Sequence, residues 1–267
     1  LVAARRLDFG QIHGRLFFGP VLSFPSHAGH CRFSMGECSF PVPSGIFRRG
    51  DSLGWDNDHM QDNSIYVKME FCYCRALSLE IIEPVIRRNA KKPKGKLTKA
   101  DFAQLAEISF VGKSIADIKP LAGLTSATNI SLIDNEIVNL QPLAKLKKLE
   151  GLQLQGNRIS NLKHLAGLTN LDRLNLSRNR IKSIAPLKNL VKLERLNLIN
   201  NTISNIAVLA QMEELSWLAL NFNQITSLKP LYGLKYLRTL MLTGNPDLED
   251  SEVETLEEKL PNCSIEY

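Results

Sequence analysis

The side chains best suited to binding chemistry recur at one fixed spacing in the second half of the chain. Arg173, Arg195 and Trp217 follow one another at intervals of 22 residues. Arginine and tryptophan are the residue types most enriched at interface hot spots, so this recurrence indicates recognition of a partner. The alternative is that Trp217 merely covers its neighbours and that the arginines are solvated, as most surface charges are.

Catalytic groups are poorly represented in the same region. Residues 106–246 hold a single histidine, His164, which is interpreted as a surface substitution. They contain no Ser/His/Asp grouping and no glycine-rich phosphate loop. We therefore expect no enzymatic activity and no cofactor.

One cluster of candidate metal ligands lies near the N-terminus, where His27, His30, Cys31 and Cys38 occur close together. Their spacing lacks the paired C-x₂₋₄-C pattern of most structural zinc sites. We expect no metal to bind there.

The elements that position the binding candidates are organised around a series of asparagines. The asparagines recur every 22 residues, and around each stands all or most of the frame L-x-x-L-x-L-x-x-N-x-I. A fixed period of this kind is the signature of a solenoid built from stacked coils. The asparagines are Asn135, Asn157, Asn179, Asn201, Asn223 and Asn245.

Each coil is predicted to contain a short strand and an extended return leg. Leu152 and Leu154 alternate with Gly151 and Gln153, which is the period of a strand with one apolar face. The chain must then turn, and an asparagine amide offers donors and an acceptor to the unpaired backbone groups of that turn. Proline in the return leg, as at Pro186, disfavours a long helix, so 3₁₀ turns and extended chain are expected on the convex side.

The segment before the coils is suited to covering their open end. Residues 79–90 carry apolar side chains at helical spacing, with Pro84 tolerable only near the start of the helix. Thr98 and Asp101 form a capping-box pattern that opens a second short helix. The first coil then carries Lys113 in place of the asparagine, a degeneracy typical of coils beside a cap.

The segment after the coils is likewise suited to covering an open end of the solenoid. Residues 251–260 place apolar side chains on one helical face and acids in the first turn, where they suit a helix N-terminus. Cys263 and Ile265 then repeat the leucine spacing one residue late. This pattern predicts a last strand in which Cys263 takes a buried leucine position as a small core residue.

These patterns predict an α/β solenoid with four parts. Residues 1–75 show no persistent period and are expected to be an irregular or disordered extension. A helical N-terminal cap is expected over 76–105, about six or seven coils of 22 residues over 106–246, and a C-terminal cap over 247–267.

Charge is distributed unevenly along the chain, whose formal net charge is +6. Residues 126–246 carry fifteen Lys and Arg against seven Asp and Glu, whereas residues 247–267 carry one against eight. A basic surplus of this size over a long surface is not a nucleic-acid footprint by itself, so RNA or polyanion binding is kept as an alternative. It would use Arg173, Arg178, Arg180, Arg195 and the lysine-rich run 91–96.

No part of the sequence predicts membrane insertion. No apolar run approaches the ~20 residues needed to span a bilayer, and the opening segment does not match a signal peptide. The compartment is left open, because the chain begins with Leu1 and export is an alternative if the true N-terminus is missing.

The 22-residue coils resemble the internalin-type leucine-rich repeats of bacteria. The resemblance rests on the repeated frame, on the Pro-Leu-x-x-Leu return leg, on GKLTKADF before the first coil and on the ending LPNCSIEY, and it covers about residues 79–267. It implies a horseshoe or arc with a parallel β-sheet on the concave face, a helical N-terminal cap and a helix-plus-strand C-terminal cap. It also implies a protein without catalysis that binds other proteins on the concave face.

In such a fold the third, fifth and seventh positions of the frame point into the concave face. We select the candidate partner-binding residues from these rows and from the position after the seventh. The expected function is a monomeric, non-enzymatic scaffold for an unidentified protein partner, with polyanion binding or a purely structural role as alternatives. The candidates are Arg173, Arg178, Arg195, Trp217, Phe222, Met241, Asn175 and Asn197.

Overall fold

The computed structural model describes residues 11–12, 15–16 and 80–267. The chain divides into two compact units, Leu1–Asp62 and Asn63–Tyr267. In the first unit, β1 (Gln11–Ile12) pairs antiparallel with β2 (Arg15–Leu16). The rest of the expected irregular extension, together with the His27, His30, Cys31 and Cys38 cluster, lies outside the described residues.

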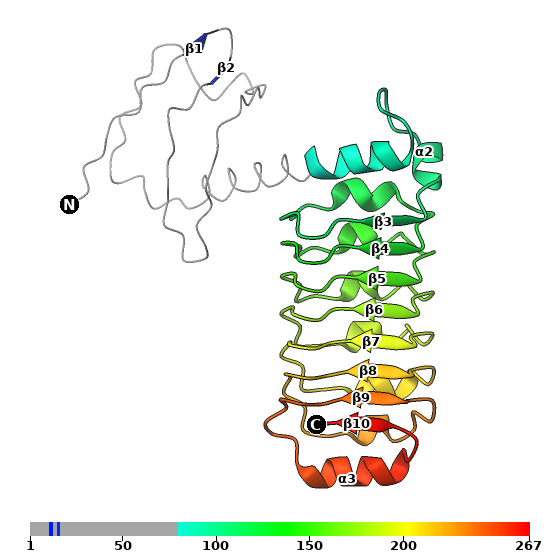
Figure 1. The fold of residues 1–267 in the computed structure, drawn as a ribbon, viewed down its shortest axis with the longest axis vertical. Helices are drawn as coiled ribbons and strands as arrows, with labels where there is room; N and C mark the ends of the chain where they lie inside the picture. The colour runs from blue at the N-terminus through cyan, green and yellow to red at the C-terminus, as the bar shows by residue number, and fades with distance from the viewer. Residues whose placement is uncertain (1–10, 13–14, 17–79) are drawn as a thin grey trace, which may run out of the picture. The chain divides into compact units, whose positions relative to one another are not determined.

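The second unit contains one eight-stranded parallel sheet in which strands follow one another in chain order from β3 to β9, with β10 at the end (Figure 1). From β3 to β9, residues 22 apart in sequence are register partners, so equivalent positions of neighbouring coils lie side by side. The predicted solenoid is confirmed. Its strands are β3 (Glu107–Ser109), β4 (Asn129–Ser131), β5 (Gly151–Gln153), β6 (Arg173–Asn175), β7 (Arg195–Asn197), β8 (Trp217–Ala219), β9 (Thr239–Met241) and β10 (Ser264–Glu266).

The leucines and isoleucines of the frame form one continuous core. Leu152, Leu154 and Ile159 of one coil are each 0% exposed. Burying one such side chain contributes about 1.5–3 kcal/mol. A single coil cannot enclose its own apolar face, so the coils must stack to gain this stabilisation. The core runs without a break from Ile82 in the N-terminal cap to Leu260 in the C-terminal cap.

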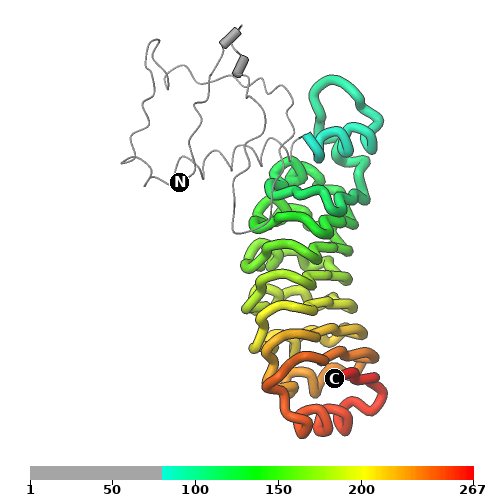
Figure 2. The backbone as a smooth tube through the Cα atoms, turned by 60° about the vertical axis from the view of Figure 1, so that its left-hand side comes forward, coloured from blue at the N-terminus to red at the C-terminus, as the bar shows by residue number. Residues whose placement is uncertain are grey.

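The return legs contain the predicted 3₁₀ turns, which lie behind the sheet on the other side of the core (Figures 1 and 2). Proline stands in the first turn of four of them, where it has no hydrogen bond to lose. The fold class predicted from the repeats is thereby confirmed. The turns are η2 (Lys119–Gly123), η3 (Gln141–Leu143), η4 (Lys163–Leu165), η5 (Ala185–Leu187), η6 (Ala207–Gln211) and η7 (Lys229–Leu231).

A second polar column, not anticipated from the sequence, starts these turns. Asn139, Asn161 and Asn205 each accept a 2.9 Å hydrogen bond from the backbone N–H two residues later. An asparagine side chain that bonds its own backbone in this way mimics a turn and fixes its direction. These asparagines therefore set where the return legs of their three coils tighten into a 3₁₀ turn.

The asparagines of the frame join neighbouring coils. The Asn179 Oδ1 atom accepts from the backbone N–H of Ile159, which belongs to the preceding coil, at 3.0 Å. Its Nδ2 atom donates to the carbonyl of Leu154 in that coil and to the carbonyl of Leu176 in its own, both at 3.0 Å. One amide thus satisfies backbone groups of two coils at once.

This geometry explains why the first coil lacks the asparagine. The amide of Asn135 already serves the first coil, accepting from the N–H groups of Lys113 at 3.2 Å and Ile115 at 3.0 Å. A side chain at residue 113 would face no earlier coil. Lysine is accordingly tolerated at that position.

The N-terminal end of the repeats is covered by two helical segments. Residues 80–89 are helical and bury Ile82 and Ile86 in the core. Pro84 is exposed and follows residues 80–83 of this helix, so the proline lies near the start of the described helical segment, as expected. The helix α2 (Lys99–Ala103) begins with the capping box that the sequence predicts between Thr98 and Asp101.

Asp101 is the most strongly perturbed acid in this cap. A 2.7 Å hydrogen bond from Lys92 and bonds from the backbone and hydroxyl of Thr98 lower the pKa of the Asp101 carboxyl to about 2. The ionised carboxylate therefore ties the loop before α2 to the helix N-terminus.

At the other end, α3 (Asp250–Lys259) covers the last coil and buries Val253 and Leu256. Glu252 anchors the helix, because its Oε2 atom accepts from the backbone N–H of Leu228 at 2.7 Å and from the Ser227 hydroxyl at 3.0 Å. These two hydrogen bonds give a structural role to one of the acids in the first turn of α3.

The register of the last strand differs from the predicted one by two residues. Ile265, and not Cys263, is the partner of Leu240. A turn closed by the 2.9 Å bond from the Cys263 N–H to the Leu260 carbonyl includes Cys263, which the prediction placed in the strand. Cys263 is consequently only half-buried at the edge of the core, where desolvation raises the pKa of its thiol.

Candidate binding face

The third repeat positions bring Arg173, Arg195 and Trp217 onto adjacent strands. Arg173 is the register partner of Arg195, which is in turn the partner of Trp217, and neighbouring strands are about 4.8 Å apart. The guanidinium carbon of Arg195 lies 5.5 Å from the centroid of the Trp217 ring. A cation over an aromatic face at this distance is attracted by the ring quadrupole. Sequence spacing predicts the adjacency of these residues but not the stacking.

The arginines of this row differ in how much of their charge is engaged. The Arg173 Nε atom lies 2.9 Å from Asp172 Oδ1, whereas Arg195 has Trp217 as its described partner. Both arginine side chains are exposed, and Trp217 is half-buried. The row therefore presents an aromatic surface with cationic groups along one side.

The fifth positions supply two asparagines that serve the backbone as well as the surface. Asn175 Oδ1 accepts from the Ser177 N–H at 3.0 Å, and Asn197 Oδ1 accepts from the Ile199 N–H at 3.1 Å. Asn175 also donates from Nδ2 to Gln155 Oε1. These bonds hold the two amides in place along the middle of the face.

The same row changes character in the last two coils. Ala219 and Met241 occupy the fifth position there, with the alanine fully buried and the methionine partly exposed. The concave face is therefore polar and hydrogen-bonded around strands β6 and β7, and it becomes more apolar towards strand β9.

The eighth repeat positions form a column that we call the ledge, at the edge of the sheet where each chain segment leaves its strand. Every residue of the ledge has a positive φ, between 51° and 80°. Its residues are Gly112, Asp134, Gly156, Arg178, Asn200, Phe222 and Gly244. Two predicted binding residues, Arg178 and Phe222, belong to this column and not to the sheet itself.

Side chains of the ledge lean across the neighbouring glycines. Arg178 Nη1 lies 3.7 Å from Asp134 Oδ1, two coils away, and Gly156 stands between them. Phe222 covers Gly244, because a Cβ atom added to that glycine would lie 2.5 Å from the Phe222 ring. The glycines therefore give the larger side chains the room to lie along the edge.

Asn221 is a residue that sequence reasoning did not select. It is 6% exposed, and its Oδ1 atom has no hydrogen-bond partner within the described part of the chain. A buried acceptor without a donor lowers stability. The sequence offers only a weak signal for it, since Asn221 stands in a row that holds Gln155, Ser177, Ile199 and Thr243 at the equivalent positions.

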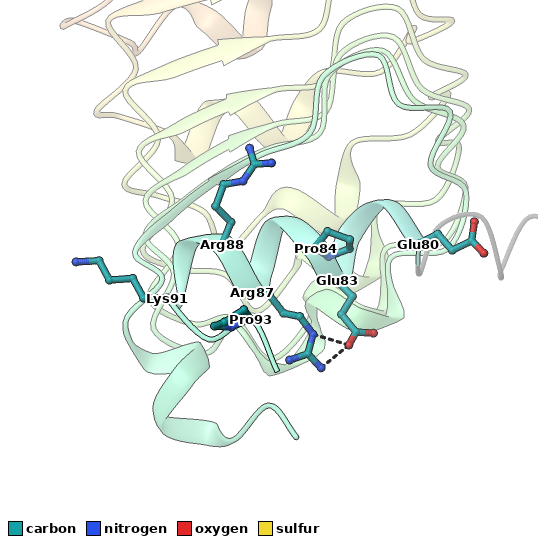
Figure 3. A pocket seen from close by; sticks show the side chains of 7 residues that line it. All are labelled: Glu80, Glu83, Pro84, Arg87, Arg88, Lys91 and Pro93. Carbon is teal, nitrogen blue, oxygen red and sulfur yellow. Dashed lines mark hydrogen bonds and ion pairs between the residues drawn. The ribbon is translucent and has the colours of Figure 1, made fainter. Parts of the chain in front are cut away.

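A hollow on the N-terminal cap is a weaker candidate (Figure 3). It is lined by Glu80, Glu83, Pro84, Arg87, Arg88, Lys91 and Pro93. Arg87 is bonded to Glu83 at 2.9 and 2.7 Å and to the Gly95 carbonyl at 2.9 Å, so its charge is already used within the cap.

Within residues 11–12, 15–16 and 80–267, no group of three or more His, Cys, Asp or Glu side chains is arranged to hold a metal ion. No helix in the same described part of the chain is long and apolar enough to cross a membrane.

The parallel sheet, 3₁₀ return legs and asparagine column define a leucine-rich repeat protein. A family model described as Leucine Rich repeats (2 copies) matches residues 169–211, which span β6 and β7. This fold is generally a protein-interaction module and is typically non-catalytic. No curated protein sequence matches the chain at a significant level.

Among solved structures, the chain is similar to internalins of Listeria monocytogenes. An internalin (inlF) superposes with a TM-score of 0.64 at 26% identity, covering 71% of this chain and 57% of that one. An internalin C2 (inlC2) superposes with a TM-score of 0.60 at 27% identity, covering 71% of this chain and 92% of that one. The predicted resemblance is confirmed, and the match spans little more than half the length of the inlF chain.

Proposed function

We propose that this protein is a non-enzymatic interaction module that binds a protein partner on the concave face of its repeats. The observation that carries the proposal is the stacking of Arg195 on Trp217, in register with Arg173 on the next strand. Arginine and tryptophan dominate interface hot spots when they lie together near the centre of a surface. Asn175, Asn197 and Met241 extend this surface along the fifth positions.

Polyanion binding is the alternative that the basic repeats support. Fifteen Lys and Arg stand against seven Asp and Glu in residues 126–246. Some of this charge is already engaged, however, since Arg173 pairs with Asp172 and Arg158 Nη2 lies 3.3 Å from Glu136. A surface of paired charges around an aromatic centre suits a protein partner better than a phosphate backbone.

Comparative capture tests the proposal. The full chain, an Arg195→Ala/Trp217→Ala variant and a control are immobilised and exposed to proteins of the native source. The matched control, Lys188→Ala/Tyr236→Ala, removes one cation and one aromatic ring from exposed positions on the return legs. We expect a captured protein whose binding is lost in the concave-face variant and retained in the control.

Salt dependence separates the two functions. Counterion release makes polyanion binding fall steeply as salt rises, whereas a mixed aromatic and ionic protein interface is less sensitive. Capture that is equal in all three proteins, or that follows nucleic acid and disappears on nuclease treatment, would contradict the proposal.

A further inference from the structure

The ledge contains two residues that are unsuited to its backbone conformation. A positive φ costs little for glycine and is tolerated by asparagine and aspartate, but it is uncommon for bulkier side chains. Arg178 and Phe222 both adopt a φ of 55°. The other ledge residues are all of the types that accept a positive φ, namely Gly112, Asp134, Gly156, Asn200 and Gly244.

The stability of the fold does not account for these two side chains. The ion pair of Arg178 with Asp134 is 3.7 Å long between side chains that are 63% and 47% exposed, so water screens most of the attraction. Phe222 is 57% exposed. Glycine occupies the equivalent position in three coils without either contact. Residues with a strained backbone conformation are found chiefly at functional sites. We therefore expect the two side chains to contact a binding partner.

The surroundings of the ledge define the chemistry of an occupant. Arg180 lies two residues after Arg178 and is exposed, with no ion pair to another described residue. Phe222 shares a coil with Trp217, so this coil carries one aromatic ring on the sheet and a second ring at its edge. The repeats as a whole carry a surplus of basic residues. The ledge therefore offers cationic groups at one point and an exposed ring at another.

We propose that Arg178 and Phe222 determine specificity by binding an acidic polypeptide segment that carries an apolar side chain. This inference rests on the proposed function and extends it to the class of partner. Carboxylates of the segment pair with Arg178 and Arg180, and its aliphatic or aromatic side chain packs on Phe222. Two coils separate Arg178 from Phe222, or about 10 Å, which roughly three residues of extended chain span.

A nucleic acid fits this edge less well. The carboxylates of Asp134 and Glu136 lie against Arg178 and Arg158, so negative charge stands among the cations where phosphates would have to sit. A polypeptide can place its own carboxylates selectively and keep clear of those acids.

Peptide selection on the full chain tests the inference. A random peptide library is selected for binding to the wild-type protein and counter-selected against the Arg178→Gly/Phe222→Gly variant. Glycine accepts the positive φ, so the variant loses two side chains without straining the coil. The control is Lys188→Ala/Tyr236→Ala, which removes one cation and one aromatic ring from exposed positions on the return legs.

We expect the enriched peptides to combine Asp or Glu with an aromatic or aliphatic residue. For such a peptide, the double glycine variant weakens Kd about tenfold or more, as truncation of hot-spot residues does, and the control changes it less than about twofold. The Tm of the double variant equals or exceeds that of the wild type, because strain has been removed.

Several results would overturn the inference. They are the absence of enriched peptides, enrichment without acidic residues, tighter binding of oligouridine than of any selected peptide, and an affinity that the double variant leaves unchanged. A fall in Tm of several degrees would also overturn it, since the side chains would then serve the fold. If binding survives the ledge variant but not Arg195→Ala/Trp217→Ala, the inference fails and the proposed function stands; if it survives both, both fail.

Discussion

Replacement of Asn179 tests whether the asparagine column holds neighbouring coils together. Its amide accepts one bond, from the Ile159 N–H at 3.0 Å, and donates to the carbonyls of Leu154, Leu176 and Ser177 at 3.0 to 3.1 Å. Asn179→Ala leaves the Ile159 N–H without a partner, whereas each of the three carbonyls keeps one other donor. One unpaired buried group costs about 1–3 kcal/mol, so we expect a loss of stability in that range.

Urea unfolding at fixed temperature measures this loss as a change in midpoint at constant slope. Asn179→Leu should be no more stable than Asn179→Ala, because the missing bonds depend on polarity and not on volume. Amide hydrogen exchange supplies a local readout, since the Ile159 N–H belongs to the coil before the substitution and should exchange faster. The control is Asn189→Ala, which replaces an exposed asparagine of a return leg and should alter stability by no more than about 0.5 kcal/mol. A loss below about 0.5 kcal/mol in Asn179→Ala, or unchanged exchange at Ile159, would refute the reasoning.

Four further predictions follow from the caps and the core. Removal of residues 1–75 should leave a cooperative thermal transition at a similar Tm, because the continuous core begins at Ile82; loss of that transition would contradict it. Deletion of 247–267 should cause self-association in light scattering by exposing the edge of β9, whereas neutralising only its acids should leave a monomer. The pKa of Asp101 is depressed in the folded state, so its contribution to stability is present above pH 4 and is lost as pH falls towards 2; Asp101→Asn should abolish that part of the pH dependence of unfolding. Asn221→Leu should raise the free energy of unfolding by about 1 kcal/mol by removing an acceptor without a described donor, and a destabilised variant would show that the amide is satisfied.

The repeated frame alone determined the architecture of the second unit. Leucines at positions one, four and six require one buried face of a strand, and proline in the return leg excludes a long helix, so stacked coils with 3₁₀ turns follow from local preferences. The capping box at Thr98 and the acidic start of α3 are likewise local signals, and the structure places a helix at each. Because positions 22 apart become register partners, the adjacency of Arg195 and Trp217 also followed from counting.

The tertiary structure decided the features that depend on which groups meet in space. The amide of Asn179 reaches a backbone N–H 20 residues earlier, and no local pattern states that its bonds cross between coils. Ile265 rather than Cys263 pairs with Leu240, because the turn after α3 has its own hydrogen bond and consumes two residues. The stacking of Arg195 on Trp217 depends on a choice of rotamer, and the positive φ of Phe222 depends on the turn imposed by the coil, although phenylalanine itself disfavours it. A sequence period specifies which positions are neighbours, whereas the conformations that those neighbours adopt are set by packing and hydrogen bonding among coils.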